Sequence, residues 1–72
     1  MDKQAEFINL EIKLRRSCAP KLNHHVYLSL FHPKENFLQI KQGETVLRTI
    51  REEDEELLWH AGIKVLEDIE KG

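Results

Sequence analysis

Cysteine, proline, glycine and long apolar runs are all scarce in this chain. It has one cysteine, Cys18, two prolines and three glycines in 72 residues. A lone cysteine cannot form an intramolecular disulfide, so a disulfide-stapled scaffold is excluded and a reducing compartment such as the cytoplasm is expected. No apolar run approaches the roughly 18 residues of a transmembrane helix, and the N-terminus lacks the pattern of a secretory signal, so no membrane association is expected.

The chain is short enough to form one domain, residues 1–72. A domain of this size buries only about 60% of the surface that its unfolded chain exposes, so its stability margin is small. Without disulfides it must depend on tight packing or on self-association. We therefore expect a homodimer.

The net charge of −2 conceals an asymmetry between the two parts of the chain. Residues 1–43 carry seven Lys/Arg against four Asp/Glu, whereas residues 44–72 carry four against nine. The first part is therefore net +3 and the second net −5. The folded molecule is expected to present regions of opposite potential.

Residues 6–16 alternate apolar residues with charged or polar ones, which is the period of a half-buried strand. The alternating apolar positions are Ile8, Leu10, Ile12 and Leu14. A helix is the alternative, because Phe7, Leu10 and Leu14 would share one helical face. That helix would leave Ile8 and Ile12 on its opposite side, so a strand is predicted.

Three further strands are predicted at residues 25–31, 37–41 and 45–48. Pro33 interrupts the first connection and Gly43 lies in the second, where glycine can adopt a positive φ. Connections this short join antiparallel neighbours, so the strands should form a meander.

A helix is predicted over about residues 50–70. Thr49 and Glu52 have the spacing of a capping box, and the acidic residues that follow favour a helix start. Its apolar stripe consists of Leu58, Gly62, Val65, Leu66 and Ile69. Gly62 costs a helix about 1 kcal/mol relative to alanine, so we interpret it as the point where the helix approaches the sheet closely.

The predicted fold is therefore α+β, a four-stranded antiparallel β-meander with one C-terminal amphipathic helix packed on one face. The inner face of the sheet would consist of Val26, Leu28, Leu30, Leu38 and Ile40. The opposite face would expose Tyr27, Phe31 and Phe37, and an exposed apolar patch usually marks an interface. A second copy of the chain, another protein or single-stranded nucleic acid stacked on the rings could cover it.

Two charged clusters are further candidates for binding. Glu52, Glu53 and Glu56 belong to the acidic run, residues 52–56. This run could imitate a phosphate backbone and contact a partner, or it could simply be a solvated helix start. The basic cluster could contact phosphate or an acidic partner, or could be the solvent face of an edge strand. The basic cluster consists of Lys13, Arg15, Arg16 and Lys21.

No motif indicates catalysis, a metal site or a cofactor. His24 and His25 would point to opposite faces of a strand, so they could not ligate one ion. We predict a small non-enzymatic regulatory or inhibitory protein that binds another protein through the aromatic sheet face or the acidic helix start. The alternatives are a single-stranded nucleic-acid-binding module and a small RNase-like toxin that uses a histidine with Arg15 or Arg16.

Overall fold

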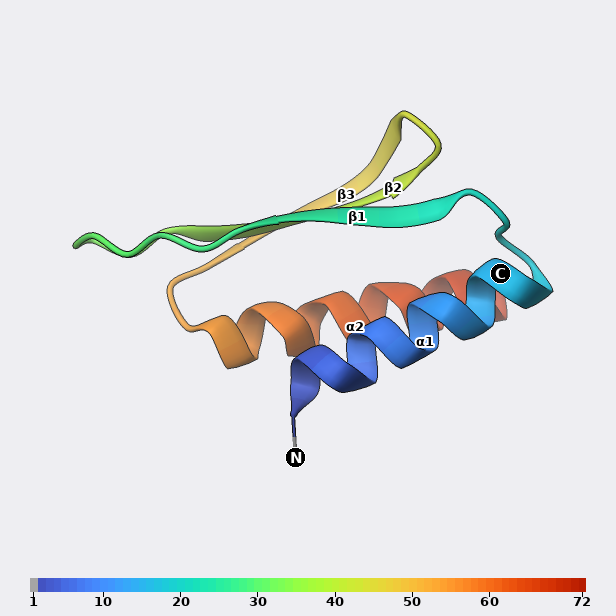
Figure 1. Cartoon of the computed structure of the whole chain (residues 1–72), viewed down its shortest axis with the longest axis horizontal. Helices are drawn as coiled ribbons and strands as arrows, with labels where there is room; N and C mark the ends of the chain where they lie inside the picture. Colours follow the sequence, from blue (N-terminus) through green and yellow to red (C-terminus); the bar gives the residue numbers. More distant parts are fainter. Residues whose placement is uncertain (1) are drawn as a thin grey trace.

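The computed structural model describes residues 2–72, which form two helices and a three-stranded antiparallel sheet. In chain order the elements are α1 (Lys3–Ser17), β1 (Leu22–Tyr27), β2 (Asn36–Gln42), β3 (Thr45–Glu52) and α2 (Glu55–Lys71). Both helices lie side by side on one face of the sheet, and no element of the described chain covers the other face (Figure 1). The fold is α+β, but the predicted four-stranded meander with a single C-terminal helix is wrong.

The predicted first strand, residues 6–16, is instead the body of α1. Asp2 caps this helix, and its carboxylate accepts a hydrogen bond of 3.0 Å from the Gln4 backbone N–H. The buried positions follow helical spacing and are Phe7, Glu11 and Leu14. The alternation was misleading because Glu11 is polar yet buried, whereas the apolar Ile12 is exposed.

The sheet has the order β1-β2-β3, and the sequential strands pair antiparallel as predicted. β2 agrees closely with the prediction for residues 37–41. β1 lies earlier than the predicted 25–31, and β3 continues past the predicted 45–48. Leu28 and Leu30 were predicted for the inner face, but they lie in the β1–β2 loop and are 39% and 85% exposed. The strand side chains that pack toward the helices are Leu22, Val26, Leu38, Ile40 and Ile50.

α2 begins at Glu55, after β3 has ended, and not near residue 50 as predicted. The predicted capping box of Thr49 and Glu52 is wrong, because both residues are paired with β2. Asp54 is the cap, and its carboxylate accepts a hydrogen bond of 2.8 Å from the Glu56 backbone N–H. Strand pairing extends through the predicted helix start, so the helix begins only at the first capping residue beyond the sheet.

The predicted apolar stripe of α2 packs against the sheet and α1. Of the stripe, Leu58, Gly62 and Leu66 are buried, and Val65 and Ile69 are partly buried; Trp59, beside the stripe, is buried as well. A Cβ atom on Gly62 would lie 2.6 Å from Leu38 Cδ2 and 2.9 Å from Phe7 Cε2. The interpretation of Gly62 as a close-approach residue is therefore confirmed, and the contact includes α1 as well as the sheet.

The variant Gly62→Ala is expected to lower the free energy of unfolding by about 1–2 kcal/mol. The added methyl group overpacks the core by about 1–3 kcal/mol, and the higher helix propensity of alanine offsets up to about 1 kcal/mol of this cost. Urea unfolding followed by the fluorescence of Trp59 measures the change. Lys64→Ala, on the exposed side of α2, is the control and should stay within about 0.5 kcal/mol. A Gly62→Ala variant more stable than the parent would contradict the close approach.

Candidate functional site

The candidate partner-binding residues separate into two surfaces. Tyr27 and Phe37 lie on the open face of the sheet, as predicted: they are cross-strand partners, and their neighbours Val26 and Leu38 point to the core on the opposite face. Phe31 does not join them, since β1 has ended before it and it lies in the loop of residues 28–35. We call these surfaces the open sheet face and the loop groove.

Three rows of cross-strand neighbours form the open sheet face. The rows are Tyr27–Phe37–Arg51, His25–Gln39–Thr49 and Asn23–Lys41–Val46. Within them, the rings of Tyr27 and Phe37 are nearly parallel, with an interplanar angle of 22° and centroids 5.5 Å apart. The centroid of the His25 ring, also on β1, lies 5.9 Å from that of Phe37. Arg51 completes the arrangement, because its guanidinium carbon lies 5.7 Å from the centroid of the Phe37 ring.

The loop groove lies between the β1–β2 loop and the start of α2, and it has a volume of about 480 Å³. Leu30 and Phe31 are 85% and 78% exposed on the loop side. The residues that line the groove are Leu30, Phe31, His32, Lys34, Glu53, Asp54 and Glu55. The structure therefore brings Phe31 together with part of the acidic run, although sequence reasoning had assigned them to separate surfaces.

Asn36 holds the two sides of the loop groove in place. Its side chain is buried and accepts a hydrogen bond of 2.8 Å from the Ser29 backbone N–H. The same amide donates a hydrogen bond of 3.1 Å to the Glu53 carbonyl oxygen. One buried amide thus links the β1–β2 loop to the connection between β3 and α2, which fixes the position of the exposed loop side chains.

Two carboxylates of the acidic run form local hydrogen bonds within the protein. Asp54 caps α2, and Glu55 accepts a hydrogen bond of 3.1 Å from the indole N–H of Trp59. Glu53 lines the loop groove, whereas Glu56 lines a different depression near the N-terminus of α1. Glu52 is half-buried at the end of β3. Glu52 and Glu53 line a further depression together, beside Glu35 and Arg51, so Glu56 is the member of the predicted trio that lies on a separate surface.

Two members of the basic cluster are engaged in internal ion pairs. Lys13 pairs with Glu70 of α2 at 2.9 Å, and Arg15 lies 3.8 Å from Glu11. Arg16 is exposed in the last turn of α1, where the helix dipole favours a cation. Lys21 is exposed in the loop that follows α1. Because these positions are on α1 and the loop after it, the predicted role on an edge strand is wrong.

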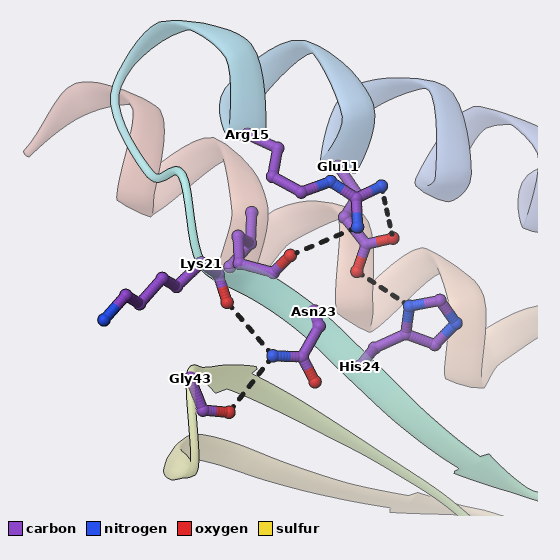
Figure 2. A network of polar contacts seen from close by, with 7 residues as sticks. Glu11, Arg15, Lys21, Asn23, His24 and Gly43 are labelled. Carbon is purple, nitrogen blue, oxygen red and sulfur yellow. Dashed lines mark hydrogen bonds and ion pairs between the residues drawn. The ribbon is translucent and has the colours of Figure 1, made fainter.

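A buried carboxylate at the interface of α1 and β1 was missed by sequence reasoning. Glu11 is only 3% exposed, and its Oε2 atom lies 2.7 Å from His24 Nδ1 (Figure 2). Arg15 approaches the same carboxylate and also donates a hydrogen bond of 3.4 Å to the Leu22 carbonyl oxygen. Glu11 follows Phe7 by four residues, and this helical spacing was the signal that could have revealed it. The group ties α1 to β1 and is too buried for a substrate to contact the carboxylate.

The fold and these surfaces define a small α+β domain with an uncovered sheet face and a groove that combines two exposed apolar side chains with carboxylates. No protein-family model, no curated protein and no solved structure matches the chain. Within residues 2–72, no group of three His, Cys, Asp or Glu side chains is placed to hold a metal ion. Neither helix of this described part combines the length and apolar character that crossing a bilayer requires.

Proposed function

We propose that the protein is a non-enzymatic binding module that captures a basic, partly apolar segment of another protein in the loop groove. The observation that supports this most directly is the juxtaposition of two exposed apolar side chains, Leu30 and Phe31, with Glu53. Two adjacent large apolar side chains with this exposure, on a chain of 72 residues, are more typical of a binding surface than of hydrophobic residues scattered singly over the surface. The exposed Cys18 thiol suits a reducing compartment such as the cytoplasm.

The two parts of the groove would make different contributions to the complex. Burying Leu30 and Phe31 against an apolar side chain would provide most of the affinity, at about 25 cal/mol per Å² of apolar surface. The carboxylates on the α2 side would increase the association rate and select partners with Lys or Arg beside the apolar anchor. Lys34 on the loop side would disfavour a segment that is uniformly cationic.

The proposal predicts that Glu53→Lys weakens the complex at least about tenfold, because a cation in the groove would repel the basic segment. Glu56→Lys is a matched control, since it reverses the same charge three residues away and outside this groove. Its effect should stay below about threefold. Tagged protein is used to capture partners from nuclease-treated lysate, and the affinity of the recovered partner for each variant is then measured by titration.

Two results would count against the loop groove as the binding site. Equal losses for Glu53→Lys and Glu56→Lys would indicate a general effect of charge near the start of α2. Phe31→Ser is expected to abolish capture, so a complex that survives this substitution would place the contact elsewhere. Circular dichroism of each variant confirms that α2 is still formed.

A further inference from the structure

We propose that the open sheet face is a second binding site, which takes about two or three nucleotides of single-stranded nucleic acid. This site is independent of the loop groove and lies on the face of the sheet that the helices leave uncovered (Figure 1). The inference depends on the rings of this face, on the sign of its charges and on its size.

The rings provide stacking surfaces at neighbouring positions. Phe37 is at the centre of the group, with Tyr27 and His25 at centroid distances of 5.5 and 5.9 Å. Tyr27 is 50% exposed, so a base can reach its ring directly. Base–aromatic stacking tolerates any sequence because every base has a π face, and it requires bases that are not already stacked inside a duplex. Single strands are therefore favoured over duplexes.

The charges of the open sheet face suit a phosphate backbone. Its strand positions carry Lys41 and Arg51, and among the residues that the structure describes none of these positions is Asp or Glu. Arg51 pairs with Glu35 of the loop at 3.1 Å, but both side chains are more than 60% exposed. An exposed pair of this kind contributes little, so a phosphate can replace the carboxylate. Of the acidic run, Asp54, Glu55 and Glu56 border the loop groove and the start of α2, whereas Glu52 and Glu53 share a depression with Arg51 at the edge of the face.

The charges of the face argue against a second copy of the chain as its occupant. A symmetric sheet-on-sheet dimer would bring Lys41 and Arg51 of both copies into one interface, where like charges repel. Three strands of about seven residues present roughly 300 Å² in projection. A short nucleic-acid segment fits the footprint and neutralises these cations.

The test measures the binding of fluorescein-labelled decamers, oligo-U and oligo-dT, to the full chain by anisotropy in 50 mM salt. Phe37→Leu keeps apolar bulk but removes the stacking surface, and it should weaken binding about five- to fiftyfold, as should Tyr27→Ala. Phe31→Ala is the matched control, because it removes an exposed aromatic ring outside this face, and its affinity should change less than about twofold. Two phosphate contacts predict a loss of about sevenfold between 50 and 200 mM salt.

Several results would overturn the assignment. Absence of binding, equal affinity for a duplex decamer, or an equal loss in Phe31→Ala would each reject the open sheet face as a single-strand site. Sedimentation of the free chain provides a separate test. A dimer that Tyr27→Lys converts to a monomer would show that a second copy covers the face. Failure of the loop-groove proposal would leave these measurements unchanged, because the decamer titration contains no protein partner.

Discussion

Replacing Phe7 with alanine is expected to lower the free energy of unfolding by about 3–5 kcal/mol. The Phe7 ring is fully buried and lies where α1, α2 and the sheet meet. It meets the His24 ring edge-on at 5.1 Å and lies 5.3 Å from Trp59. It also occupies the space beside Gly62, where no Cβ intervenes. Removing it leaves a cavity that three elements border, and the rigid close contact between them limits how far they can collapse.

The consequence would be severe for so small a domain, whose whole stability is expected to be about 4–11 kcal/mol. Urea unfolding followed in parallel by far-ultraviolet circular dichroism and by Trp59 fluorescence would measure the loss. Ile12→Ala is the matched control, because it truncates an apolar side chain on the same helix at an exposed position. It should cost less than about 1 kcal/mol. Similar losses in the two variants would mean that α1 is not docked as described.

The element that sequence reasoning assigned wrongly, α1, shows where local patterns stop being informative. Residues 6–16 fit both the period of a strand and the period of a helix. The choice between strand and helix depended on whether the side chain at position 11 is buried or exposed to solvent. A glutamate at that position favours solvent unless a partner is known. The partner, His24, is thirteen residues away on β1. Its position depends on the fold itself, so the periodicity could not decide between strand and helix.

The start of α2 was misplaced for a related reason. Thr49 and Asp54 are both good capping residues, and local propensity does not distinguish between them. The pairing of β3 with β2 extends past Thr49 and leaves only Asp54 outside the sheet. By contrast, β2 and the apolar stripe of α2 were predicted well, because their patterns depend on burial of one face and not on a distant polar partner.

The two candidate binding surfaces could be predicted only in part from the sequence. Tyr27 and Phe37 share a face because strand alternation places them there, and this follows from sequence. The path of the loop of residues 28–35 does not, because it depends on the hydrogen bonds of Asn36 to Ser29 and to the Glu53 carbonyl. Those two contacts move Phe31 away from the sheet and place it beside the acidic run.

Replacing Glu11 with alanine is expected to lower the free energy of unfolding by about 2–4 kcal/mol. The substitution removes the acceptor of the 2.7 Å contact with His24 and the carboxylate that faces Arg15. These two side chains can still reach some water, since they are 22% and 41% exposed. The cost is therefore smaller than for a fully enclosed ion pair, and it includes the cavity left between α1 and β1.

The control for this variant is an ion pair that also involves α1 but is exposed to solvent. Glu70→Gln removes the partner of Lys13, whose side chain is 66% exposed, and should cost less than about 1 kcal/mol. A double-mutant cycle with Glu11→Met and His24→Leu, whose side chains retain volume but cannot form this hydrogen bond, then separates the hydrogen bond from the cavity, and a coupling energy of about 1–2 kcal/mol is expected. A coupling energy near zero would mean that Glu11 contributes only its packing. Because this pair links α1 to β1, as does the hydrogen bond of Arg15 to the Leu22 carbonyl oxygen, its coupling energy measures its own share in holding the N-terminal helix beneath the sheet.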